Sequence, residues 1–168
     1  MSASPGVLLA LFMIAAPLLG QAPGQTSSPA PQAPAMQTLS DAKLREMLEG
    51  LGLAPRKLTK GYLVAIQREG WTYNLQLVLS SDFTKLGMNA NLATSSNPSA
   101  LPASVWRTLL EDNVDVDPSC FYFNRKLNRL YLHRALDNRD ITPDFLRQQI
   151  DKFCQNIKDT AADWGGIK

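Results

Sequence analysis

The sequence predicts an α+β domain in which a single antiparallel five-stranded sheet carries its helices on one face. The first observation is the alternation of apolar and polar side chains over Trp71–Ser80, which is typical of a strand with one buried face. The second is a pair of aromatic-rich segments, Cys120–Asn124 and Arg129–Leu136, joined by a short polar turn. Helical patterns stand before, between and after these strands. The predicted order is α-β-β-β-α-β-β-α.

The first helix is expected to begin near Ser40. Thr38 and Asp41 have the spacing of a capping box, and Gly50 and Gly52 end the helical pattern. One apolar stripe at helical spacing would face the core, made of Leu44, Met47, Leu48 and Leu51.

Three consecutive strands are predicted over residues 62–92. Glu69-Gly70 fits a tight turn between the first two, because glycine reaches a positive φ without steric cost. The buried sides of the second and third strands would consist of Trp71, Tyr73, Leu75, Leu77, Leu79, Leu86, Met88, Ala90 and Leu92. The first strand is apolar on both sides, since Leu63 and Ala65 alternate with Tyr62, Val64 and Ile66.

A polar loop over residues 91–101 leads to a second helix, whose first turn suits Pro102. Val105 and Leu109 would face the core, together with either Trp106 or Leu110. Thr142-Pro143-Asp144 combines a cap, a proline at the first helical position and an acid, so it predicts the start of the last helix. The buried face of that helix would hold Leu146, Ile150, Phe153 and Ile157.

The amino-terminal third has a different composition from the rest. The first forty residues contain no charged side chain, and Val7–Leu19 is an apolar run too short to span a bilayer but suited to a signal peptide. The alternative is a buried helix, which Pro17 and the proline-rich segment behind it disfavour. We therefore expect a signal peptide over residues 1–24, a Pro/Gln/Ala/Ser-rich disordered linker over 25–38 and the α+β domain over 39–164. The mature protein would be exported, periplasmic or secreted, with no membrane span.

The net charge of the chain excludes few classes of partner. A net charge of +2 and a pI near 8.6 are too mild to indicate a nucleic-acid or membrane-surface partner by themselves. Basic residues do cluster with tyrosines around the second hairpin, at Arg125, Lys126, Arg129 and Tyr131. They could contact phosphates or an acidic peptide, but charges that protect a sheet edge from aggregation are the commoner case, and no nucleic acid is expected.

Candidate chemistry is sparse. His133 is the only histidine, and no metal-ligand spacing surrounds it. Asn113, Asp115 and Asp117 have the alternate spacing of a calcium loop, but Pro118 replaces the required glycine. No nucleophile elbow, phosphate-binding loop or dinucleotide motif is present, so no catalytic residue, metal ligand or cofactor is predicted.

The two cysteines, Cys120 and Cys154, are too few for a zinc ribbon. Cys154 lies on the apolar face of the last helix. In an oxidising compartment the two could form one disulfide; otherwise they would be two buried thiols. The pattern leaves both possibilities open, because it does not decide to which side Cys120 points.

The order of elements resembles that of YbjN-like domains and type III secretion chaperones. Two motifs are particularly similar, N-R-x-L-N-R-L-Y-L at Asn124–Leu132 and T-P-x-x-L at the start of the last helix, and the resemblance covers Leu39–Trp164. It implies a non-enzymatic fold that dimerises and binds extended protein segments. Secretion chaperones are cytosolic and usually acidic, whereas this chain is mildly basic and is expected to be exported. The resemblance therefore implies the fold and a binding function, not the role of a secretion chaperone.

We accordingly predict a non-enzymatic exported binding or assembly module that forms a homodimer and engages a peptide or protein partner in the cell envelope. Because Leu63, Ala65 and Val78 lie on the side of the sheet that one helical layer leaves uncovered, they are expected to form the interface, together with the residues of the second hairpin. The alternative is a small envelope hydrolase or metal-dependent enzyme that uses His133 with nearby acidic residues.

Overall fold

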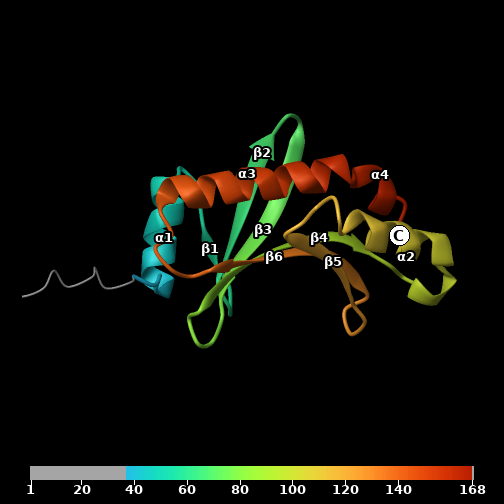
Figure 1. The fold of residues 1–168 in the computed structure, drawn as a ribbon, viewed down its shortest axis with the longest axis horizontal. Coiled ribbons are helices and arrows are strands. Elements are labelled where there is room, and N and C mark those ends of the chain that lie inside the picture. The colour runs from blue at the N-terminus through green and yellow to red at the C-terminus, as the bar shows by residue number, and fades with distance from the viewer. Residues whose placement is uncertain (1–36, 168) are drawn as a thin grey trace, which may run out of the picture. The chain divides into compact units, whose positions relative to one another are not determined.

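The structure is a computed structural model, and it describes residues 37–167. The predicted signal peptide and residues 25–36 of the predicted linker lie outside the described residues. In the described part, helices cover one face of a single antiparallel sheet, with α3 lying across it, α1 towards one end and α2 and α4 towards the other (Figure 1). The α+β class is therefore confirmed.

The sheet has six strands, not the predicted five. In chain order they are β1 (Arg56–Lys57), β2 (Tyr62–Arg68), β3 (Trp71–Leu79), β4 (Lys85–Thr94), β5 (Ser119–Asn124) and β6 (Arg129–Asp137). Their spatial order is β1-β2-β3-β4-β6-β5, and every neighbouring pair is antiparallel. The additional strand, β1, pairs through only two residues, Arg56 opposite Leu63 and Lys57 opposite Tyr62. A strand this short shows no period, so the predicted element order was wrong at this point.

The helices are α1 (Asp41–Gly50), α2 (Ala103–Asp112), α3 (Pro143–Asp159) and the short α4 (Ala161–Trp164), and a single 3₁₀ turn spans Pro98–Ala100. The cap of α1 is Ser40, whose hydroxyl accepts the Lys43 N–H at 3.2 Å, and not Thr38 as the capping-box spacing predicted. The cap of α3 is Thr142, with Pro143 at the first helical position, as expected.

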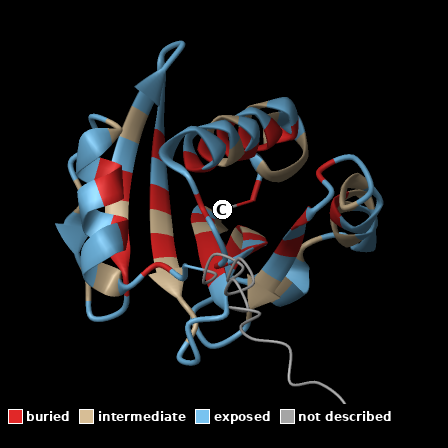
Figure 2. Cartoon of the chain, turned by 60° about the vertical axis from the view of Figure 1, so that its left-hand side comes forward, coloured by how far each residue is buried: buried red, intermediate tan, exposed pale blue. Residues whose placement is uncertain are grey.

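The face of the sheet below the helices forms the core. Strand register places Val64, Leu75, Ala90, Leu132 and Phe121 in one row across it, and all five side chains are buried. The buried residues form stripes along the strands in Figure 2. The predicted inward sides of β3 and β4 are confirmed by buried Tyr73, Leu75, Leu77, Leu86, Met88 and Ala90. Trp71 is an exception: it is 37% exposed at the end of its strand, where it stacks on Tyr73 with ring centroids 6.1 Å apart.

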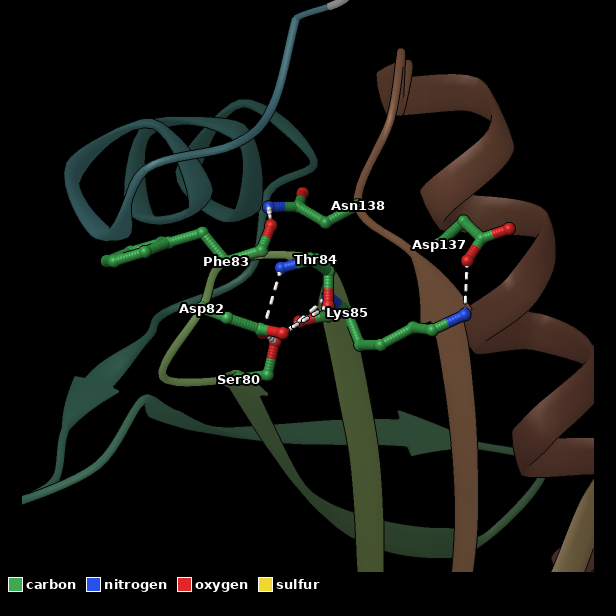
Figure 3. A network of polar contacts seen from close by, with 7 residues as sticks. All are labelled: Ser80, Asp82, Phe83, Thr84, Lys85, Asp137 and Asn138. Atoms are coloured by element: carbon green, nitrogen blue, oxygen red, sulfur yellow. Dashed lines mark hydrogen bonds and ion pairs between the residues drawn. The ribbon is translucent and has the colours of Figure 1, made fainter.

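Asn138, which directly follows β6, joins three distant segments of the domain (Figure 3). Its side chain is fully buried. The amide oxygen accepts the Leu39 N–H at 3.1 Å, and the amide nitrogen donates to the carbonyls of Leu39 at 3.0 Å and Phe83 at 2.9 Å. One side chain thus fixes the entry to α1, the β3–β4 loop and the end of β6 relative to one another.

The β3–β4 loop is organised by Asp82 (Figure 3). Its carboxylate accepts hydrogen bonds from the hydroxyls of Ser80 and Thr84 and from the Thr84 N–H. Because these donors favour the charged form, they lower the pKa of Asp82 to about 2. The following residue, Phe83, has a φ of 56° and is 48% exposed, so the loop holds a bulky residue in a conformation that glycine normally occupies.

Candidate protein-binding surface

An apolar groove lies between α2 and β5, at one outer edge of the sheet. Its volume is about 240 Å³. Aromatic and aliphatic side chains supply nearly all of its lining, which consists of Trp106, Leu109, Leu110, Asn113, Phe121, Tyr122, Phe123 and Leu130. We call this the α2–β5 groove.

The period of α2 explains which of its side chains build the groove. Leu109 is buried, and Trp106 is half-buried against the edge of the Phe123 ring, with centroids 5.2 Å apart and planes at 73°. Leu110 points away from the core and is 69% exposed. Of the two candidates for the core-facing position, the structure therefore selects Trp106 and leaves Leu110 at the rim of the groove.

A wider hollow of about 720 Å³ continues from the groove. The two share Trp106 and Phe123, so their surfaces are continuous. The remaining lining of the hollow is more polar and comes from Pro98, Ser99, Arg125 and Asn128. The groove is thus apolar beside α2 and becomes polar and basic towards the β5–β6 turn.

Large exposed apolar side chains gather at this end of the domain. Seven such side chains occur in the described chain, and four of them lie on α2, on β5 or in the turns that flank β5: Leu110 at 69%, Val114 at 79%, Tyr122 at 40% and Leu127 at 52% exposed. Exposed apolar residues grouped in this way mark interaction surfaces more often than scattered ones do.

The backbone edge of β5 is partly occupied. The N–H of Phe121 points away from β6 and donates to the Asn113 side-chain oxygen at 2.6 Å, and the N–H of Ser119 donates to the Val116 carbonyl at 2.9 Å. These contacts protect the edge against the addition of another strand. A partner at this surface would therefore contact side chains rather than pair with these backbone groups.

Charges flank β5 with opposite signs. Asp115 and Asp117 are exposed just before the strand, and Arg125 and Lys126 are exposed in the turn just after it. In the part of the chain that the structure describes, none of the four takes part in an ion pair. Arg129, which begins β6, is also exposed and unpaired there.

The predicted interface is divided between two regions. Leu63, Ala65 and Val78 alternate with core residues on β2 and β3, so they lie on the uncovered face of the sheet, and Leu63 and Val78 are half-buried. Arg125, Lys126, Arg129 and Tyr131 lie at the β5–β6 end, where Tyr131 stacks on Tyr122 with ring centroids 5.2 Å apart.

His133 lies on the uncovered face, between two neutral neighbours. Its Nδ1 is 2.9 Å from the Asn89 side-chain oxygen, and its ring meets Tyr122 edge to face. Burial lowers the pKa of His133, which favours the neutral imidazole. No carboxylate is hydrogen-bonded to it within residues 37–167, so the structure adds no support for the enzyme alternative.

The cysteines lie on opposite sides of the sheet and are free. Cys120 is exposed and stands opposite His133, on the uncovered face. Cys154 is buried on the core-facing side of α3, where burial raises the pKa of its thiol to about 11. Of the two possibilities left open by the sequence, the structure therefore shows separate thiols, of which only one is buried.

The acidic segment after α2 forms turns rather than a loop around a cation site. Asp112 is half-buried, and its pKa is raised, first by burial and then by the nearby carboxylates of Asp163 and Asp115. Within the described residues, no group of three or more His, Cys, Asp or Glu side chains could hold a metal ion. No helix in residues 37–167 is long and apolar enough to cross a membrane.

A second, smaller hollow of about 200 Å³ lies at the opposite edge of the sheet, between β2, α3 and the segment after α1. Leu51, Leu53 and Ile66 form its apolar part. Arg147 crosses it to donate to the Leu51 carbonyl at 2.9 Å, and Arg68 pairs with Asp151 at 3.0 Å. We call this the β2-edge hollow.

No protein-family model and no curated protein sequence matches the chain. Several solved structures do match the chain. YbjN from E. coli, described as a candidate transcription regulator, is 15% identical with a TM-score of 0.56, covering 76% of this chain and 96% of that one. The ExsC-ExsE complex matches with 14% identity, a TM-score of 0.51 and coverage of 71% and 89%. The HopA1-SchA chaperone-effector complex matches with 10% identity, a TM-score of 0.50 and coverage of 69% and 88%.

The protein thus has the fold of YbjN-like and type III secretion chaperone-like domains, as the sequence motifs indicated. At these identities the likeness is one of fold. One of the matched structures is a chaperone in complex with an effector.

Sequence analysis did not identify the α2–β5 groove as a unit. The available signal was the pair Leu110 and Val114, two large apolar residues four positions apart that continue past the end of α2 into the acidic segment. Such a pair, one on the outer side of a helix and one in the turn after it, indicates an exposed apolar surface.

Proposed function

We propose that this protein is a non-enzymatic binding module that is exported to the cell envelope, forms a homodimer and holds a peptide or protein partner. The α2–β5 groove is the observation that supports this proposal best, because it joins a concave apolar surface to the most exposed apolar side chains of the domain. The structural likeness to chaperone-effector complexes agrees with a protein as the ligand.

The two concave surfaces would serve different partners. The α2–β5 groove carries more exposed apolar area and is assigned to self-association. The β2-edge hollow lies at the other edge of the sheet, so it stays accessible in such a dimer. Its apolar lining beside Arg147 suits a short segment that presents an apolar side chain and an acidic one.

Site-specific photo-crosslinking in intact cells tests partner binding. A photoreactive side chain in place of Leu53, which lines the β2-edge hollow, should yield one or a few discrete heavier adducts. The same group in place of Lys152, which is exposed on α3 outside the hollow, is the matched control. Equal adduct patterns at both positions, or none at Leu53, would contradict a binding role for this hollow.

Export has its own test. The mature protein should begin between Gln21 and Gln25, because small residues after the apolar run provide a cleavage site there. Mass spectrometry of the native protein should find that new amino terminus in the envelope fraction. An intact Met1 or Ser2 would exclude a cleaved signal peptide.

A further inference from the structure

We infer that the domain binds a small carboxylate with an apolar body, about the size of one ring, in a hollow beside the β3–β4 loop. The hollow has a volume of about 280 Å³, and it is lined by that loop, by the end of β3 and by the turn that joins β1 to β2. We call it the Phe83 hollow, after the exposed aromatic residue in its lining. It shares no lining residue with the α2–β5 groove or the β2-edge hollow, so this inference does not rest on the proposed function.

The backbone at Phe83 indicates that its side chain is placed for a ligand. Four residues other than glycine have a positive φ in the described chain, Glu69, Phe83, Asn128 and Asp140, and Phe83 is the only apolar one among them. A bulky side chain makes this conformation unfavourable, and strain of this kind concentrates at ligand sites. Phe83 is nevertheless 48% exposed, so its ring gains little from the core in return. The fold alone therefore does not account for an aromatic residue at this position.

Both walls of the Phe83 hollow are held in place by the domain itself. The Asp82 carboxylate accepts three hydrogen bonds from within the loop, and Asn138 donates to the Phe83 carbonyl at 2.9 Å. The Phe83 ring points away from this polar network (Figure 3). At the wall formed by the β1–β2 turn, the backbone packs on β3 so closely that a β-carbon on Gly61 would overlap the Leu77 carbonyl oxygen. Because the site is built without a ligand, binding requires little ordering of the chain.

The lining defines the chemistry of the ligand. It has an apolar part and a part with polar side chains: Val78, Leu79 and Phe83 in the first, and Thr59, Lys60 and Ser81 in the second. Within the described residues, none of these three polar side chains takes part in a hydrogen bond or an ion pair. Lys57 also lines the hollow, but its ammonium is paired with Asp41, so Lys60 carries the unpaired charge of the lining. One cation and two hydroxyls beside an apolar surface suit a carboxylate attached to an apolar body.

The size and surroundings of the hollow favour a small molecule over a peptide. Pockets for drug-sized ligands span about 300–1,000 Å³, so this hollow accommodates about one ring-sized group. An extended peptide would gain affinity by pairing its backbone with a strand edge. Beside the hollow that edge is closed, because β1 already pairs with Tyr62 and Leu63 of β2.

An NMR titration of the purified protein with three probes tests the ligand class. Phenylacetate should shift the amide signals of Val78 and Phe83. It should bind about tenfold more tightly than phenylacetamide, which has the same ring without the charge, and than acetate, which has the charge without the ring. No shift of either signal at about 20 mM phenylacetate, or equal affinities for the three probes, would overturn the site.

Two variants assign the contacts. Phe83→Asn should weaken phenylacetate binding about tenfold and yet melt within about 4 °C of wild type, since asparagine tolerates a positive φ. Lys60→Gln should weaken phenylacetate binding about tenfold and leave phenylacetamide binding unchanged. Phe145→Ala is the matched control: Phe145 is 41% exposed on the first turn of α3, outside the hollow, so this variant should bind phenylacetate like wild type.

The contrary outcomes are distinct. A Phe83→Asn variant that melts far below wild type would show that the ring serves the fold, and would overturn its role in binding. Equal phenylacetate affinity in Lys60→Gln and wild type would overturn the carboxylate as the recognised group. A peptide with a carboxyl-terminal phenylalanine that binds at least about tenfold more tightly than phenylacetate would replace the small molecule by a protein terminus as the ligand.

Discussion

Replacing Asn138 with alanine should lower the free energy of unfolding by about 2–6 kcal/mol. The side chain is 0% exposed and satisfies three backbone groups, the N–H and C=O of Leu39 and the C=O of Phe83. A buried polar group left without its partner costs about 1–3 kcal/mol. Both groups of Leu39 become buried and unpaired in the variant, whereas water can reach the partly buried Phe83 carbonyl. The sum therefore falls within the stated range.

Urea unfolding of the two proteins side by side measures this difference. Asn74→Ala, on the uncovered face of the sheet, is the matched control and should change stability by less than about 0.5 kcal/mol. Native-state hydrogen exchange should also show faster exchange of the Leu39 amide in Asn138→Ala. If Asn138→Ala unfolds at the same urea concentration as Asn74→Ala, the side chain does not join the three segments energetically.

Three further changes test other parts of the domain. Leu77→Ala should cost about 2–5 kcal/mol because Leu77 is fully buried in the core, while Gln76→Ala removes one exposed hydrogen bond and should cost about 1 kcal/mol or less. Equal effects in urea would contradict this assignment of the two sides of β3. Arg134→Met should raise the free energy of unfolding by about 1–3 kcal/mol, because the described residues offer no hydrogen-bond partner to the buried Nε and Nη1 of Arg134. A lower melting temperature in the variant would contradict this prediction. Asp82 has a pKa of about 2 in the folded protein against 3.8 ordinarily, so the stability it contributes should be complete above about pH 5 and lost as the pH falls through 2. NMR titration should show that the pKa of Asp82 rises in Ser80→Ala. An unchanged pKa would rule out the Ser80 hydrogen bond as a cause of the shift.

The strands that sequence analysis located correctly are those whose signal is local. In β3, the buried positions Tyr73, Leu75 and Leu77 alternate with polar residues, and no information from elsewhere in the chain is needed to detect that period. The start of α3 was equally local, because Thr142 and Pro143 adjoin in sequence. These elements were therefore predictable without any knowledge of the fold.

Features that depend on distant partners were not predictable in this way. The two residues of β1 become a strand only because β2 runs beside them. Asn138 and Leu39 are 99 residues apart, so nothing near either residue signals their hydrogen bonds. The side to which Cys120 points is likewise fixed by its pairing with His133 on β6, which is why the cysteine pattern alone allowed a disulfide as well as free thiols.

Predicting the α2–β5 groove requires both a local sequence pattern and a contact between distant residues. Helical periodicity assigns Leu109 to the core but cannot choose between Trp106 and Leu110, which flank the same stripe. The choice is made by Phe123, whose ring packs against Trp106 and so turns Leu110 outward. The shape of the groove is thus determined by a contact between a helix and a strand that are separated by the turns of the acidic segment.

The basic residues of the second hairpin illustrate how the structure changes the meaning of a sequence pattern. Charges that protect a sheet edge should lie along the edge strand. However, β5 (Ser119–Asn124) contains no charged residue. Hydrogen bonds from its own N–H groups to Asn113 and Val116 protect that edge instead. The charges stand beyond its two ends with opposite signs, an arrangement that repels a second copy in the parallel orientation and attracts one in the antiparallel orientation. The edge is therefore protected against strand addition at these two N–H groups, while the charges beyond its ends stay exposed.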